Sequence, residues 1–196
     1  MAQAEWAAEI ADTAPAGPLL ELCSGVGQIG LALARLCADR GRPRDLVLVD
    51  AESHACSLAR RNVDHAGLGS AVEVRESTLQ QALRPDEMFA VIVADPPWVP
   101  TVETARYPAD PLWAIDGGAD GMVLARDCVA VISRHLLPGG SAVLQLGTVG
   151  QIEGLANDLR EPLELVEQRD VEDANGALAK LVHRGRGLEV LCANRP

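Results

Sequence analysis

Short apolar runs alternate along the chain with segments of helical periodicity, and the alternation begins near residue 18. Continuous apolar runs are typical of buried strands, whereas apolar residues spaced three and four apart are typical of helices. The runs that predict strands lie at 18–23, 45–50, 71–76, 89–94 and 141–147. The segments that predict helices lie at 29–40, 53–67, 121–136 and 149–161. Such alternation indicates an α/β fold with a mainly parallel sheet.

The two ends of the chain give weaker patterns. Residues 1–17 predict either a short helix leading onto the sheet or a frayed tail. Near the other end, three segments are candidates for extended strands: 163–171, 177–184 and 188–195. Either of the last two could be the final strand. Two local boundaries are also expected, with Ser53 as a helix N-cap and Gly67 as its stop, while LPGG at 137–140 predicts a turn.

Length, composition and charge limit the possible functions. The 196 residues suit a single domain spanning 1–196, and the 3% aromatic content implies a core of aliphatic residues. The net charge of −11 disfavours a nucleic-acid partner. Five cysteines without C-x-x-C pairs favour a reducing compartment, and no stretch is typical of a secretory signal or membrane span. We expect a cytoplasmic protein, and the histidine spacing predicts no metal site.

The stretch ELCSGVGQIG at 21–30 places glycines 25, 27 and 30 between a predicted strand and a predicted helix. This G-x-G-x-x-G spacing lets a cofactor lie against the backbone. Asp50 follows Gly30 by 20 residues at the end of the second predicted strand, where a carboxylate can accept hydrogen bonds from ribose hydroxyls. Both a nicotinamide dinucleotide and S-adenosylmethionine (SAM) fit these features.

Glu21 distinguishes the two cofactors. Its carboxylate lies four residues before Gly25, where it would repel a pyrophosphate and attract the ammonium and sulfonium of SAM. The alternative is a carboxylate that caps a neighbouring loop. Glu76 and Ser77, after the third strand, are candidates for binding the adenine amino group or are simply solvent-exposed. We interpret Cys23 as a small packing residue within the cofactor loop rather than a nucleophile.

The fourth predicted strand ends in the sequence DPPW at residues 95–98. Pro96 and Pro97 fix a rigid turn with free carbonyls, Asp95 offers a hydrogen-bond acceptor, and Trp98 offers a flat face. Together they suit a planar NH₂ group at the carboxyl edge of the sheet. We therefore expect Asp95 to accept an N–H bond and stabilise positive charge on the acceptor nitrogen. The alternative is a structural Pro-Pro turn with a buried tryptophan and an Asp cap.

These segments, together with AIDGGADGM at 114–122 and LPGGSAVLQLG at 137–147, resemble class I SAM-dependent methyltransferases over residues 18–155. In particular they resemble the HemK/PrmC-type glutamine N5-methyltransferases, which modify the GGQ loop of peptide release factors. The resemblance implies a Rossmann-like seven-stranded sheet with helices on both faces and an antiparallel last hairpin. It implies an acceptor site at 95–98, and the predicted cofactor residues are Glu21, Cys23, Gly25, Gly27, Asp50, Ala51, Glu76, Ser77 and Asp95.

The chain departs from that family in two ways. The usual motif is N-P-P-Y, and D-P-P-[YFW] is commoner in enzymes that methylate exocyclic amino groups of bases. Bacterial members also carry an N-terminal helical domain for which this chain has no room, while archaeal and eukaryotic relatives lack it and work with a small zinc-binding activator subunit. An activator subunit is therefore a possible partner here.

The predicted function is N-methylation of an amide or amino nitrogen, with a protein glutamine or a small molecule as acceptor. A nucleic-acid amino methyltransferase is the first alternative, because DPPW favours it and the charge opposes it. An NAD-dependent oxidoreductase and a non-catalytic methyltransferase-like subunit are more distant. Residues 102–121 contain Tyr107, Trp113 and four acidic residues, and predict either an acceptor-side lid or a solvated acidic loop.

Overall fold

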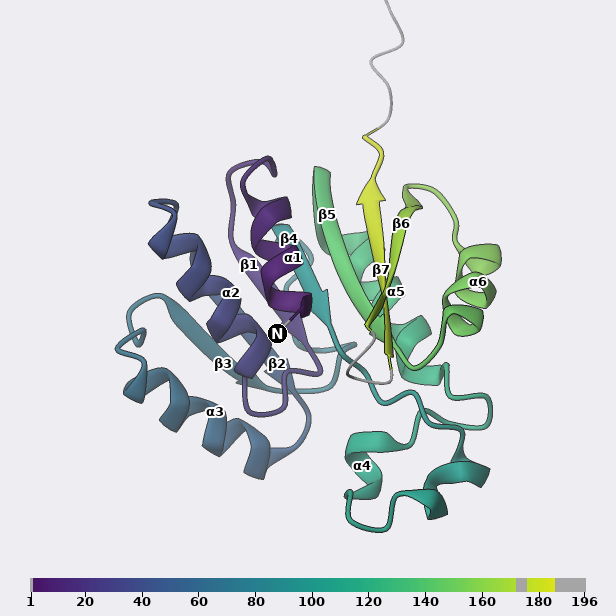
Figure 1. The fold of residues 1–196 in the computed structure, drawn as a ribbon. Coiled ribbons are helices and arrows are strands. Elements are labelled where there is room, and N and C mark those ends of the chain that lie inside the picture. The colour runs from purple at the N-terminus through teal and green to yellow at the C-terminus, as the bar shows by residue number, and fades with distance from the viewer. Residues whose placement is uncertain (1, 172–175, 186–196) are drawn as a thin grey trace, which may run out of the picture.

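The computed structural model describes residues 2–171 and 176–185, in which seven strands form one sheet of order β3-β2-β1-β4-β5-β7-β6 (Figure 1). Parallel pairing joins the first five strands, and β7 runs antiparallel to both of its neighbours. The strands are β1 Leu19–Leu22, β2 Leu46–Asp50, β3 Val72–Glu76, β4 Phe89–Ala94, β5 Leu136–Leu146, β6 Leu163–Val171 and β7 Gly176–His183. The α/β, mainly parallel fold with an antiparallel last strand is confirmed.

Helices cover both faces of the sheet. Against one face lie α1 Ala2–Ala11, α2 Gln28–Asp39 and α3 Ser53–His65, and against the other lie α5 Val123–His135 and α6 Val149–Asp158. A 3₁₀ helix, η1 Thr101–Arg106, and the short α4 Leu112–Ile115 lie beyond the sheet, in the segment that follows β4 (Figure 1).

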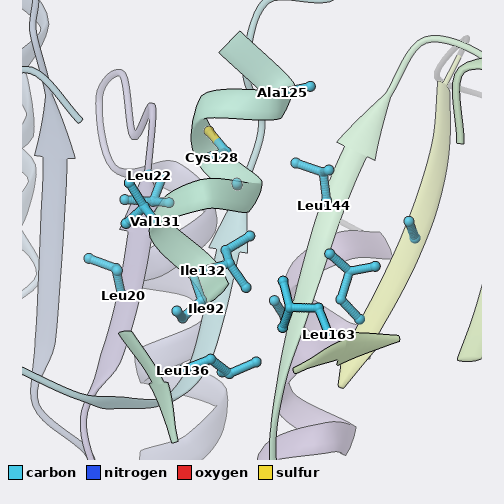
Figure 2. Packing of buried hydrophobic residues seen from close by; sticks show 14 of the residues in the cluster. Leu20, Leu22, Ile92, Ala125, Cys128, Val131, Ile132, Leu136, Leu144 and Leu163 are labelled. Carbon is cyan, nitrogen blue, oxygen red and sulfur yellow. The ribbon is translucent and has the colours of Figure 1, made fainter. Parts of the chain in front are cut away.

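Strand alternation divides the core into two aliphatic layers. In β1, Leu19 faces the layer under α1, α2 and α3, whereas Leu20 and Leu22 face the layer under α5 and α6. Figure 2 shows the second layer, where α5 packs its buried side chains on β1, β4 and β5. In the first layer, Trp6 of α1 is buried beneath the Arg169 guanidinium, which lies 4.1 Å from its ring centroid.

The ends of the chain settle the weaker predictions. The helix alternative for residues 1–17 is confirmed by α1, which is largely buried. Of the two candidates for the final strand, 177–184 corresponds to β7, while 188–195 lies outside the described residues.

Two predicted boundaries are wrong. Glu52, not Ser53, is the N-cap of α3, because the Asp50 carboxylate accepts the Glu52 N–H and turns the chain there. The predicted turn 137–140 lies inside β5 as an irregularity, since Phe89 pairs with Leu136 while Val91 pairs with Ser141. Gly67 does follow the end of α3, with a positive φ of 67°.

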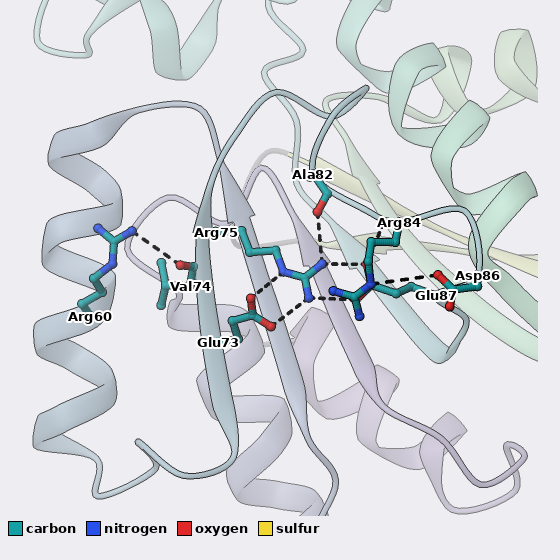
Figure 3. A network of polar contacts seen from close by, with 8 residues as sticks. All are labelled: Arg60, Glu73, Val74, Arg75, Ala82, Arg84, Asp86 and Glu87. Carbon is teal, nitrogen blue, oxygen red and sulfur yellow. Dashed lines mark hydrogen bonds and ion pairs between the residues drawn. The ribbon is translucent and has the colours of Figure 1, made fainter.

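Arg75 on β3 anchors the segment that leads into β4 (Figure 3). Its guanidinium donates to both carboxylate oxygens of Glu87, at 2.8 and 2.9 Å, and to Glu73 and the Ala82 carbonyl. The bonds from Arg75 lower the pKa of Glu87 to about 2, so the pair is charged at neutral pH. The network thereby fixes the segment that carries Ser77.

Candidate functional site

A cavity of about 590 Å³ opens at the carboxyl ends of β1, β2, β3 and β4, the edge where parallel α/β sheets bind ligands. Eight of the predicted site residues line it: Glu21, Cys23, Gly25, Asp50, Ala51, Ser77, Asp95 and Pro97. Gly27, Glu76, Pro96 and Trp98 are not among the lining residues. The structure thus brings eight of the twelve predicted cofactor and acceptor residues to one cavity.

The glycine loop is shaped by close contacts with β2. Gly27 has a φ of +78°, and a Cβ there would lie 2.7 Å from a Leu48 methyl. A Cβ on Gly30 would lie 2.5 Å from Glu21 Oε2 and 2.8 Å from Leu48. Side chains are therefore excluded at both positions, which lets the loop lie directly on the strand ends.

Glu21 is almost completely buried, and its Oε2 accepts the Gly30 N–H at 2.8 Å in the first turn of α2. Burial raises its pKa to about 8, and the charges of Asp95 and Asp50 act in the same direction. The carboxylate therefore has features of both interpretations, because it caps the helix and also lines the cavity.

Asp50 joins the glycine loop to the start of α3. Its Oδ2 accepts the Gly25 N–H at 2.7 Å, and its Oδ1 accepts the Glu52 N–H at 2.8 Å. Each carboxylate oxygen has further acceptor capacity. Asp50 also lines the cavity, and its acceptance of ribose hydroxyls stays a prediction.

Five acidic side chains line the cavity and no lysine or arginine does, among the residues described; the acids are Glu21, Asp50, Glu52, Asp95 and Asp127. Those that are ionised favour a cationic ligand and oppose a pyrophosphate, and a cationic ligand would also favour the ionised form of Glu21, whose pKa is raised by burial. The hydroxyl of Ser24, a lining residue, is buried without a hydrogen-bond partner among the described residues. The cavity therefore fits SAM, whose ammonium and sulfonium offer the missing positive charge and whose polar groups offer a partner for that hydroxyl.

Asp95 begins the turn after β4. Burial raises the pKa of its carboxyl to about 6, and no described residue donates a hydrogen bond to it. An ionised carboxylate left without protein donors in a cavity is available to a ligand.

Two glutamine side chains hold this turn in place. Gln3 of α1 donates from Nε2 to the carbonyls of Ala94 and Val143, both at 3.0 Å. Gln151 of α6 donates to the Trp98 carbonyl at 3.0 Å and accepts the Gly147 N–H at 3.0 Å. Gln3 thus links β4 to β5 before residues 95–97, and Gln151 links Trp98 to Gly147 after them.

The Trp98 ring packs on the backbone of Gly147, where a Cβ would lie 2.1 Å from a ring carbon. The ring therefore supports the turn from the side of β5, and the cavity wall is formed by Pro97. That Trp98 covers the face of an acceptor stays a prediction.

Cys23 has a φ of 54°, unusual for a residue with a side chain. Its sulfur lies 3.9 Å from that of buried Cys128 on α5, which agrees with its interpretation as a packing residue.

Sequence reasoning missed several lining residues. Gln80 donates to Asp127 of α5 at 3.1 Å, and both line the cavity. Gln80 lies three residues beyond Ser77, so the end of the third strand gave a signal for it. No sequence signal marks Asp127, because only tertiary packing brings α5 to this edge of the sheet.

The lid predicted from the sequence spans residues 102–121. We define it from here on as residues 99–121, because Val99 and Thr101 close its base. Val99 and Asp116 form an isolated bridge, and the Asp116 carboxylate accepts the Thr101 hydroxyl at 2.7 Å and the Gly118 N–H at 2.9 Å. Trp113 and Ala114, from α4, line the cavity. The lid therefore borders the ligand site.

Two features are absent from the described part of the chain. No group of three or more histidine, cysteine, aspartate or glutamate side chains could hold a metal ion there. No helix there has the length and apolar character needed to cross a bilayer.

Fold and cavity together define a class I methyltransferase. Among solved structures, TrmN from Thermus thermophilus is similar with a TM-score of 0.67 and 20% identity, covering 92% of this chain and 48% of that one. CcbJ from Streptomyces caelestis gives 0.62 and 16%, covering 92% and 95%. At these identities the likeness concerns the fold.

The chain belongs to the methyltransferase small domain family, whose model matches residues 7–110. The release factor glutamine methyltransferase of Gloeobacter violaceus is 31% identical over 151 residues, which are 72% of this chain and 51% of that protein. The ribosomal protein uL3 glutamine methyltransferase of Bordetella pertussis is 35% identical over 132 residues, or 65% and 43%. The chain spans about half the length of these relatives. The family confirms the predicted class and SAM as its methyl donor.

Proposed function

We propose that this protein transfers a methyl group from SAM to the side-chain amide nitrogen of a protein glutamine. The observation that carries the proposal is Asp95, a carboxylate without protein donors, on a turn held by two glutamines beside an acid-lined cavity. The names of two similar proteins support the acceptor class, since both describe glutamine methyltransferases that act on proteins.

The cofactor side of the cavity would hold SAM through three groups. Asp50 would accept the ribose hydroxyls, Glu21 would attract the cationic methionine portion, and Ser24 would supply its unpartnered hydroxyl. SAM supplies a methyl group on a positively charged sulfur. The remaining predicted residues, including Ser77 beside the adenine, would complete this side.

The acceptor side would orient the nucleophilic nitrogen. The Asp95 carboxylate accepts one amide N–H, and the free carbonyls of the Pro-Pro turn suit the other. A bond forms between nitrogen and the methyl carbon as the carbon–sulfur bond breaks, and its electron pair returns to sulfur. The nitrogen then loses one proton, which Asp95 accepts or passes to water, so a neutral N-methyl amide results. The chain contributes alignment and electrostatic stabilisation.

The test is transfer of tritiated methyl from SAM to three acceptors in parallel: unmethylated bacterial peptide release factor, unmethylated ribosomal protein uL3, and total RNA. We expect label in protein, with mass spectrometry placing one added methyl on a glutamine. Asp95→Ala serves as the inactive control. Label confined to RNA would overturn the protein-acceptor proposal in favour of base methylation.

Two further predictions concern the cell. The need for a small activator subunit is tested by assaying methyl transfer by the isolated chain. If the isolated chain methylates its acceptor and no added protein raises the rate, no activator is required. A cytoplasmic location stays a prediction that fractionation can check.

A further inference from the structure

Exposed apolar side chains concentrate on the lid. The structure exposes six large apolar residues among those described, and four of them belong to the lid: Val102 at 86%, Leu112 at 62%, Trp113 at 50% and Tyr107 at 40%. A fifth, Val123, follows the lid directly. Since aromatic residues make up only 3% of the chain, two of them on one exposed segment indicate an interaction surface.

The lid presents this surface as a preformed lobe. Its base is closed by the backbone bonds from Gly117 N to the Val99 carbonyl and from Thr101 N to the Gly118 carbonyl, at 2.8 and 2.9 Å. The lobe extends beyond the body of the domain (Figure 1), and Trp113 belongs both to its exposed surface and to the cavity wall. A molecule bound on the lobe would therefore lie beside the cavity.

The charge on the lid selects the kind of partner. Glu103 pairs with Arg106, and Asp120 pairs with Arg126. Asp110 and Asp116 have no basic partner among the described residues. These acids oppose a phosphate backbone and complement a basic segment of protein.

We propose that the lid docks the acceptor protein, through a segment that inserts an apolar side chain and is flanked by lysine or arginine. Leu112 and Val102 supply the apolar contact, and Asp110 supplies electrostatic attraction. This inference rests on the proposed function, because it places the glutamine-bearing segment beside Asp95.

The experiment compares the double variant Val102→Ser/Leu112→Ser with a matched control, Val166→Ser on β6, which removes an exposed valine far along the sheet order from β4. Binding of unmethylated release factor and of uL3 is measured by surface plasmon resonance, and methyl transfer is measured in parallel. For the double variant we expect a dissociation constant and a KM for the acceptor about tenfold higher, with kcat and SAM affinity within about twofold of the unaltered protein. The control should match the unaltered protein.

The charge contribution is tested with Asp110→Lys. It should raise the acceptor KM about threefold at low salt, and the difference should disappear at high salt.

The outcomes separate docking from chemistry. Binding without methyl transfer would overturn the proposed function and leave lid docking supported, provided that the double variant weakens binding. Unchanged binding by the double variant, or equal weakening by Val166→Ser, would overturn lid docking while leaving the transfer reaction intact. A dimer that the double variant dissolves in sedimentation would assign the surface to a second copy of the chain, and RNA binding that the variant weakens would assign it to RNA. No binding of either protein also rejects the proposal.

Discussion

The two sides of the cavity are built in opposite ways. On the cofactor side, Glu21 and Asp50 each accept a backbone N–H of the glycine loop, and glycines fill places where a methyl group would collide. On the acceptor side, the backbone hydrogen bonds of the lid join it, among the described residues, to itself and to Val123, and the lid exposes Val102 and Leu112. The proposed donor site is thus shaped by backbone geometry, whereas the proposed acceptor surface is formed by exposed side chains, which can change without disturbing the fold.

The turn at residues 95–98 lies between these extremes. It belongs to the proposed acceptor side, yet Gln3 and Gln151 hold it by hydrogen bonds to the Ala94 and Trp98 carbonyls. The rigid part of the acceptor side is thus the part that would touch the reacting nitrogen, and the exposed part is the part that would recognise the rest of the acceptor.

The largest expected effect falls on turnover and leaves SAM binding largely unchanged. Asp95→Ala should lower kcat by about 100-fold or more, because the developing charge on nitrogen loses its carboxylate. The SAM dissociation constant, measured by calorimetry, should change little. Turnover equal to that of the unaltered protein would remove Asp95 from the acceptor site.

A conservative replacement sharpens the assignment. With a pKa of about 6, Asp95 is ionised at neutral pH, and turnover should fall as the pH drops through that value. Asp95→Asn introduces the residue that is usual in the HemK/PrmC-type motif. It should remove the fall in turnover at acidic pH. If turnover of the asparagine variant still falls at acidic pH, the titration of another group causes that fall.

The next effect concerns the cofactor side alone. Asp50→Ala should weaken SAM binding about 10- to 100-fold, since hydrogen bonds between a ribose and a carboxylate are lost together with support for Gly25. At saturating SAM, kcat should remain close to normal. The control is Asp45→Ala, outside the cavity, which should leave SAM binding unchanged.

A pH-dependent effect tests Glu21. Burial raises its pKa from 4.5 to about 8, so a cationic ligand that requires its ionised form should release a proton and bind more tightly as the pH rises toward 8. Without ligand the folded state holds this proton more strongly than the unfolded state, so Glu21 makes stability decline with rising pH between those values. Glu21→Gln should abolish the pH dependence of ligand affinity, measured by calorimetry. It should also abolish the decline in stability that Glu21 causes, measured by denaturant titration. Identical pH profiles in the variant would contradict the assignment.

The smallest effect compares two helical glycines. Gly30→Ala should destabilise the fold by about 1–3 kcal/mol, because the new methyl meets Glu21 and Leu48. Gly154→Ala in α6, where nothing lies within 4 Å, should stabilise it by about 0.5–1 kcal/mol. Urea unfolding of both variants measures the contrast, and equal effects would mean that the glycine loop has more room than its contacts indicate.

The sequence predicted features with local signatures. Continuous apolar runs located the strands of the parallel part of the sheet, and the acidic residues at strand ends, Glu21, Asp50 and Asp95, located the edge at which the cavity opens. Boundaries were less predictable, because the Asp50 carboxylate begins α3 one residue early and the irregularity at 137–140 depends on pairing with β4.

Long-range contacts explain what the sequence could not show. Gln3 reaches strands β4 and β5 from the start of the chain, and nothing around it distinguishes it from any glutamine in a helix. Asp127 reaches the cavity only because α5 packs on the sheet. The charge of Glu21 was evident, but its burial, and hence its raised pKa, required the structure.

The scarcity of tryptophan has an optical consequence. Of the three tryptophans, Trp6 is buried beneath Arg169, Trp98 supports the DPPW turn and Trp113 borders the cavity. Of the three intrinsic fluorophores, one thus lines the cavity and one supports the turn beside it, while the third reports on the opposite layer of the core. Changes in emission on adding a ligand would come mainly from the site, so occupancy of the donor and acceptor sides can be followed without any attached dye.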